Sequence, residues 1–177
     1  LGCQWRKGHY NRLDVLVRYM AIEEEFDGGG HGWSLYRAMQ ERRGPYSRRE
    51  EAFREMLQSM SRNGYAADSP IEVDWNLQLV DGAHRLAGAL YFGVESVPVT
   101  VFPGRFRCDY GRGWFEKSGF AAEQLAQIER KRLELFRSNS LHFIAVLWPA
   151  VWQYFDEIQD RLELNFTVLN TLDCSLG

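Results

Sequence analysis

The spacing of apolar residues predicts that most of the chain is helical. In residues 11–26, Leu13, Leu16, Val17 and Met20 recur at intervals of three and four, which places them on one face of a helix. The same period predicts four further helices, over residues 33–42, 48–63, 83–92 and 120–136.

Local signals mark the ends of these helices. A capping box, Ser47 followed three positions later by Glu50, opens the helix expected from residue 48, and Gly64 ends it. A glycine-rich segment, 27–32, separates the first two helices. No Gly-Lys-Ser/Thr motif and no strand accompany it, so we interpret it as a linker rather than a phosphate-binding loop.

Between residues 71 and 101 the period changes from 3.6 to 2. Apolar and polar residues alternate over 71–80, but Asp and Asn are poor strand formers. We therefore expect two short strands, 71–73 and 77–80, joined by a turn at 74–76. A third strand is expected over 97–101, where Pro98 indicates an edge position or a strand start.

Beyond Pro103 the pattern changes again. A buried strand is expected over 143–147 and a final helix over 149–162. The segment 108–114 is an aromatic and glycine-containing loop with arginines around it. Such a loop either closes over a ligand as a lid or packs on the domain.

Composition describes one globular domain, or one domain with a helical extension. The chain has 177 residues, 45% hydrophobic and 25% charged, which excludes a disordered or collagen-like protein. Its net charge of −3 argues against a DNA-binding protein, so DNA is not an expected partner. The longest apolar run, 143–152, is half the length of about 20 residues that a bilayer requires, so no membrane span is expected.

The cysteines and histidines indicate a cytoplasmic protein without zinc. Cys3, Cys108 and Cys174 form no CxxC pair and are odd in number, which is typical of free thiols in a reducing compartment.

Of the 21 basic residues 18 are arginine. This excess indicates either phosphate recognition or arginine-rich codon usage. Neither end of the chain closes an element, so further domains of a longer chain are expected partners.

The segment Asp81-Gly82-Ala83-His84-Arg85 carries the clearest chemistry. It is expected to join a strand to the first turn of a helix, where free N–H groups and the helix dipole attract anions. Gly82 has no Cβ and would admit a ligand oxygen close to the backbone. Arg85 can bind two phosphate oxygens and His84 can donate to another. Asp81 then holds Mg²⁺ or polarises a hydroxyl.

A purely structural interpretation fits the same residues. Asp is a common N-cap, so Asp81 would only cap the helix, with His84 and Arg85 as surface residues. Arg48 and Arg49 likewise either face a nucleotide or lie on an exposed helix face.

The motif nevertheless resembles that of the ParB/sulfiredoxin superfamily. The similarity covers residues 47–102 and rests on Pro70-Ile71-x-Val73, on 79–87 with its "DGxHR" run, on Gly93 and on Val97-Pro98-Val99. It implies an α/β fold in the broad sense (mixed α+β), with a small mixed sheet of ParB/sulfiredoxin type and N- and C-terminal helical extensions. The implied parts are a helical extension at 1–46, the core at 47–103 and a helical region at 104–177 that packs on the core.

Differences within the motif separate the activities of this superfamily. Sulfiredoxins carry cysteine where this chain has Ala83, which excludes peroxiredoxin repair. ParB proteins bind CTP through a "GERR"-like motif and continue into a DNA-binding module that is not recognisable here. Free serine kinases carry "DGHHR"-like motifs, which Asp81, His84 and Arg85 match. These kinases also use a glutamate base, for which Glu50, Glu51 and Glu72 are candidates.

The resemblance therefore implies a nucleotide-dependent kinase that phosphorylates the hydroxyl of a small molecule, such as an amino acid or a sugar. Asp81, His84 and Arg85 would be catalytic, and Gly82 and Ala83 would bind the nucleotide together with His84 and Arg85. Asp81 would be the Mg²⁺ ligand, with ATP or ADP, or alternatively CTP, as the nucleotide. A general likeness to proteins of bacterial polysaccharide gene clusters suggests surface-polysaccharide biosynthesis as the setting. The alternatives are a ParB-like nucleotide-binding switch and a structural domain of a larger polysaccharide-biosynthesis protein.

Overall fold

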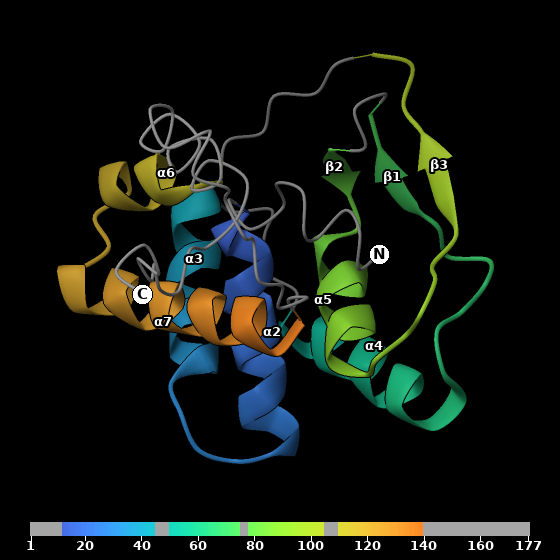
Figure 1. The fold of residues 1–177 in the computed structure, drawn as a ribbon, viewed down its shortest axis with the longest axis horizontal. Helices are drawn as coiled ribbons and strands as arrows, with labels where there is room; N and C mark the ends of the chain where they lie inside the picture. The colour runs from blue at the N-terminus through green and yellow to red at the C-terminus, as the bar shows by residue number, and fades with distance from the viewer. Residues whose placement is uncertain (1–11, 45–49, 75–77, 105–109, 140–177) are drawn as a thin grey trace, which may run out of the picture. The chain divides into compact units, whose positions relative to one another are not determined.

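The computed structural model describes residues 12–44, 50–74, 78–104 and 110–139 (Figure 1). The chain divides into two compact units, Leu1–Ser140 and Leu141–Gly177, and the second lies outside the described residues. Within the described part the elements are α2 (Leu13–Phe26), α3 (Gly32–Arg43), α4 (Glu50–Asn63), β1 (Ile71–Val73), β2 (Leu79–Asp81), α5 (Ala83–Tyr91), β3 (Val99–Val101), α6 (Arg112–Lys117) and α7 (Ala122–Asn139). Among these residues no helix is both long and apolar enough to cross a bilayer.

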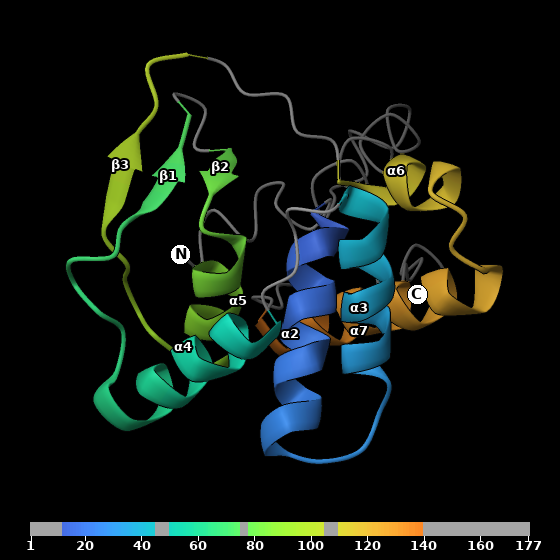
Figure 2. The same ribbon diagram turned by 180° about the vertical axis from the view of Figure 1, so that it is seen from behind.

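Helix α2 is the central element of the described unit. It packs against α3, α5 and α7, and these neighbours bury most of its surface (Figures 1 and 2). Gly32 begins α3 directly against the backbone of Met20, where an added Cβ would lie 2.1 Å from the carbonyl oxygen. The sequence needs glycine there because the two helices approach so closely.

The three strands form one mixed sheet in the order β2-β1-β3. Strands β1 and β2 are antiparallel, with a register shift between Glu72 and Val73, whereas β1 and β3 are parallel. Helix α5 connects β2 to β3 and contacts β1. The side chains of Ile71, Val73 and Leu79 are buried in the core, while every residue of β3 is exposed at the edge of the sheet.

A buried ion cluster ties α2 to this sheet. Arg12 binds both carboxylate oxygens of Asp14 and donates to the carbonyl oxygen of Leu79 at 2.7 Å. Arg18, which is 1% exposed, binds the same carboxylate at 3.2 Å. Burial alone would raise the pKa of Asp14, but the hydrogen bond from Arg12 and the charge of Arg18 outweigh it, so the pKa is lowered.

The mixed α/β class predicted from the sequence is confirmed, with six helices and a small three-stranded mixed sheet in the described part. The second strand runs over Leu79–Asp81 rather than 77–80, because Asp81 joins the ladder opposite Glu72. Helix α6 was not predicted, since part of it was interpreted as loop. The strand expected over 143–147, the helix over 149–162 and the N-cap Ser47 lie outside the described residues.

Candidate functional site

The predicted motif lies at the junction of β2 and α5. Asp81 ends the strand, Gly82 is the N-cap residue and Ala83 is the first residue of the helix. Gly82 has a φ of +93°, in the left-handed region that favours glycine. A Cβ on Gly82 would lie 2.7 Å from Cγ2 of Ile71 and 3.2 Å from Nη2 of Arg85. These two side chains therefore fill the side of Gly82 on which a Cβ would stand.

Asp81 at the end of β2 and Arg85 in the first turn of α5 interact directly. Arg85 donates through Nη2 to Oδ2 of Asp81 at 3.1 Å and through Nη1 to the carbonyl oxygen of Pro70 at 2.6 Å. The Asp81 side chain is 76% exposed. Helix α5 has no side-chain cap, so the interpretation of Asp81 as its N-cap is wrong. The carboxylate instead faces the guanidinium that we predicted to bind phosphate.

Glu72 is the only one of the three candidate base residues that lies in register with Asp81. The two residues pair across the antiparallel β1–β2 ladder, beside the register shift. Like charges directly opposite each other destabilise a sheet, and Arg85 neutralises only the Asp81 member. The described residues contain no group of three or more His, Cys, Asp or Glu side chains arranged to hold a metal ion.

His84 contacts residues of α3 and α4. Its Nε2 lies 2.9 Å from the hydroxyl of Tyr36 on α3, and its ring packs edge-on against Phe53 of α4 at a centroid distance of 4.5 Å. Gln40, one turn further along α3, donates to the same hydroxyl at 2.8 Å. Consecutive helical residues point about 100° apart, so His84 and Arg85 contact different elements. The structure thus separates two side chains that the sequence analysis assigned to one ligand.

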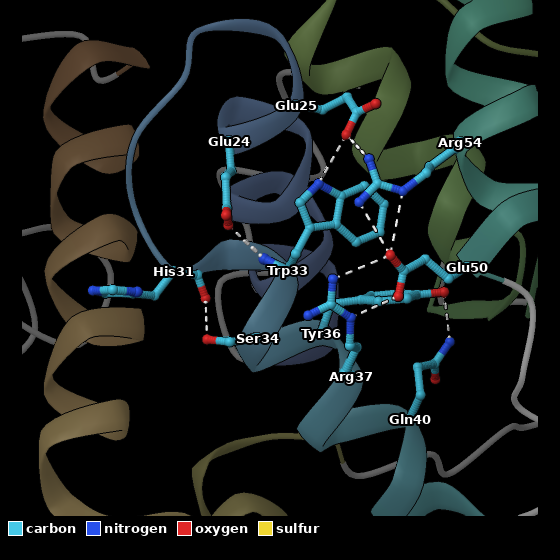
Figure 3. Close-up of polar contacts among 10 residues, drawn as sticks. All are labelled: Glu24, Glu25, His31, Trp33, Ser34, Tyr36, Arg37, Gln40, Glu50 and Arg54. Carbon is cyan, nitrogen blue, oxygen red and sulfur yellow. Dashed lines mark hydrogen bonds and ion pairs between the residues drawn. The ribbon is translucent and has the colours of Figure 1, made fainter.

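Glu50 belongs to an ion-pair network that links α2, α3 and α4 (Figure 3). Its carboxylate accepts from Nε of Arg37 at 2.8 Å and from Nη2 of Arg54 at 3.0 Å. Arg54 also pairs with Glu25, and its guanidinium lies 3.7 Å from the ring centroid of Trp33. The Glu50 carboxylate is engaged by two guanidinium groups that tie α4 to α3, so this position favours a structural role for Glu50. Glu51 is exposed on the same helix.

The remaining candidates lie apart from the motif or outside the described residues. Arg48, Arg49 and 105–109 belong to the undescribed segments, so the predicted lid is described only from Tyr110. There Arg112 begins α6 and binds Glu116 at 2.7 Å. A cavity of about 410 Å³ lies between α6 and α7 and contains none of the motif residues. It is lined by apolar residues, among them Phe120 and Leu125, and by the charged side chains of Arg112, Glu116 and Glu129.

Sequence reasoning missed Tyr36, Gln40 and the carbonyl of Pro70. The only signal was the spacing of Tyr36 and Gln40, which puts both on one face of a helix. Nothing in the sequence pairs that face with His84, which is 48 positions away.

Comparisons of the chain with protein-family models, with curated proteins and with solved structures found no match. The case for a function therefore rests on the geometry of the motif and on the residues around it.

Proposed function

We propose that the protein is a nucleotide-dependent kinase that transfers a phosphoryl group to the hydroxyl of a small molecule, such as an amino acid or a sugar. The observation that carries the proposal is the exposed Asp81 carboxylate, held against Arg85 at the uncapped start of α5. Phosphoryl transfer depends on positioning and on charge neutralisation. The start of α5 offers a helix N-terminus and the Arg85 guanidinium for phosphate, with the Asp81 carboxylate beside them. The similarity of residues 81–85 to the motif of free serine kinases in the ParB/sulfiredoxin superfamily supports the kinase assignment. We also propose that the three-stranded sheet is of the ParB/sulfiredoxin type.

The residues present fit a nucleotide with Mg²⁺. Mg²⁺ is usually held by one or two carboxylates together with phosphate oxygens, and Asp81 with Glu72 opposite offers such a pair. When bound, the ion neutralises charge that develops on the transferred group. ATP or ADP is the proposed nucleotide, with CTP as the alternative.

Four residues of the motif have a proposed task. The amides of Gly82 and Ala83 bind the donor phosphates, and Arg85 neutralises them with a charge-assisted hydrogen bond. Because Arg85 is bound to Asp81 in this structure, phosphate must compete with that carboxylate for the guanidinium. Asp81, once released, is available to a metal ion or to the hydroxyl of the acceptor.

Nucleotide binding and turnover test the proposal in sequence. We expect ATP, ADP or CTP with Mg²⁺ to raise the melting temperature, since a ligand at 100 times its Kd stabilises by about 2.7 kcal/mol. We expect turnover only after addition of a hydroxyl-bearing acceptor, found by screening amino acids and sugars. Binding with slow hydrolysis and no acceptor requirement would instead support a switch, and no binding of any nucleotide would overturn the proposal.

A further inference from the structure

Strand β3 is the outermost strand of the sheet (Figures 1 and 2). Within the described residues no other strand pairs with its outer edge. On the inner side, the carbonyl of Pro98 and the N–H of Phe102 bind β1, at 3.0 Å and 2.7 Å. Because successive residues of a strand direct their backbone groups to opposite sides, the N–H and C=O groups of Val99 and Val101 face outward.

The side chains of the same two valines extend the apolar face of the sheet. Val99 and Val101 lie in register with Ile71 and Val73 of β1, so each pair shares one face. Ile71 and Val73 are both 2% exposed, whereas Val99 is 47% and Val101 is 56% exposed. Apolar side chains and outward backbone groups therefore meet at this edge of the sheet.

The edge of β3 lacks the usual protection against pairing with another strand. Natural edge strands carry charged residues or bulges, or are covered by another element. Residues 97–103 contain no charged residue. Pro98 lacks an N–H only on the side of β1, so it removes no donor from the outer edge. At the β2 end of the sheet, by contrast, Arg12 binds the carbonyl oxygen of Leu79.

We propose that β3 pairs with β3 of a second copy of this chain, antiparallel and across a two-fold axis at Thr100. This register places Val99 of one copy opposite Val101 of the other, and each such pair exchanges both of its N–H···O bonds. The two Thr100 side chains face each other, which is a favourable cross-strand pair. No like charges meet, because 97–103 is uncharged.

A second copy fits because the edge is complementary to itself. Arg12 occupies the other end of the described sheet, so each copy offers one open edge and the pairing closes after two copies. The three strands of each copy then form one continuous sheet. Thr100 lies in register with Glu72, so this sheet would carry both candidate sites. The pairing requires no nucleotide and goes beyond the proposed function.

Sedimentation equilibrium of the full chain over a range of concentrations tests the pairing. The contact involves three strand residues of each copy, so we expect a weak dimer with a Kd of about 1 µM to 1 mM. The average mass should rise with concentration from that of one chain toward twice that value. Val101→Pro removes an outward N–H but no bond to β1, so this variant should stay monomeric. Val101→Ile, the matched control, should associate like the parent.

Disulfide cross-linking tests the register. In a full-length background with Cys3, Cys108 and Cys174 replaced by serine, Thr100→Cys places two cysteines opposite each other. Their Cα atoms would lie about 4.5 Å apart, within reach of a disulfide. Val99→Cys places them diagonally, about 7–8 Å apart, which is too far. We expect oxidation to give a covalent dimer in Thr100→Cys and not in Val99→Cys.

A parent that stays monomeric at every concentration would overturn the inference and leave this edge to a strand of a different protein. Association of Val101→Pro equal to that of the parent would also overturn it, as would equal cross-linking of Thr100→Cys and Val99→Cys. If Val101→Pro does not fold, the cross-linking pattern decides. Failure to bind any nucleotide would overturn the kinase proposal and leave the dimer unchanged.

Discussion

Arg85 and Asp81 form an ion pair across the first turn of α5, with Nη2 and Oδ2 3.1 Å apart. The same guanidinium donates to the Pro70 carbonyl at 2.6 Å, so Arg85 links β2 to the residue that precedes β1. An exposed pair of this kind contributes only about 0–1 kcal/mol to stability. Its main consequence concerns ligands, because a phosphate at this helix end must displace Asp81 from Arg85.

The substitution Asp81→Asn separates binding from turnover. Asparagine keeps the shape of the side chain but releases Arg85 from its charged partner, so nucleotide affinity should stay the same or increase. Turnover should fall by roughly 10²–10⁴-fold, the range typical of a lost acid–base group. Isothermal titration with nucleotide and a coupled assay with the acceptor measure the two quantities.

Asp27→Asn is the control for this change, since Asp27 is exposed at the end of α2 and accepts a hydrogen bond from Tyr91. It should alter neither affinity nor turnover. Turnover of Asp81→Asn within a few-fold of the parent would exclude a catalytic role for Asp81.

Substitutions of Arg85 test the guanidinium itself. Arg85→Ala should weaken nucleotide binding by about 1.5–3 kcal/mol, the range for a hydrogen bond to a charged group. Arg85→Lys should restore only part of this, because an ammonium group cannot bind two oxygens as a planar guanidinium does. Arg37→Ala removes an exposed arginine that binds Glu50 and should leave affinity unchanged. Equal losses of nucleotide affinity in Arg85→Ala and Arg37→Ala would show that binding depends only on the net charge of the protein.

The end of α4 and the edge position of β3 were predicted correctly, because single glycine and proline residues determine them. Gly64, with a φ of +76°, directly follows α4, and β3 lies at the sheet edge, as Pro98 indicated. Helix α6 escaped prediction because six residues are too few to display a helical period.

The arrangement of the site depends on contacts between distant residues. The pairing of Tyr36 with His84 spans 48 positions, and no local pattern specifies it. The sequence analysis explained Gly82 by its missing Cβ and did not predict its left-handed backbone. Its backbone is left-handed, as glycine permits, but Ile71 and Arg85 fill the space beside it. The sequence thus predicted the junction of strand, glycine and helix at residues 81–83, whereas the direction of each side chain followed from tertiary packing.

Glu72→Gln should raise the free energy of unfolding and weaken the Mg²⁺ dependence of nucleotide binding. Removing one of two paired carboxylates relieves repulsion with Asp81, which should stabilise the sheet by roughly 0.2–1 kcal/mol. The same change should weaken the Mg²⁺ dependence of nucleotide binding, since one potential ligand is lost. Urea unfolding and nucleotide titrations over a range of Mg²⁺ concentrations test both effects. Glu51 is exposed on α4, so Glu51→Gln should change neither the free energy of unfolding nor the Mg²⁺ dependence of nucleotide binding.

Gly82→Ala should destabilise the protein through both its backbone and its neighbours. A left-handed conformation costs a non-glycine residue about 1–2 kcal/mol, and the new Cβ would also displace Ile71 from its 2.7 Å approach. Gly29→Ala has a similar φ of +80° but no atom within 4 Å of the added Cβ. The difference between the two free energies of unfolding therefore reports the cost of the contacts with Ile71 and Arg85. Equal losses would mean that these contacts relax without cost.

The buried Asp14 should control how stability depends on pH. The pKa of Asp14 is lowered in the folded state from its ordinary value of 3.8, because Arg12 and Arg18 outweigh the effect of burial. The stabilisation from its charge is therefore fully present above the unfolded pKa and is lost as pH falls through the folded pKa. Asp14→Asn should lose roughly 3–5 kcal/mol at neutral pH, since Arg18 remains buried without its charged partner. Chemical unfolding from neutral pH down to about pH 3 should then show a shallower acid-induced loss in Asp14→Asn than in the parent. Parallel pH profiles for the two proteins would show that the charge of Asp14 does not contribute to folding.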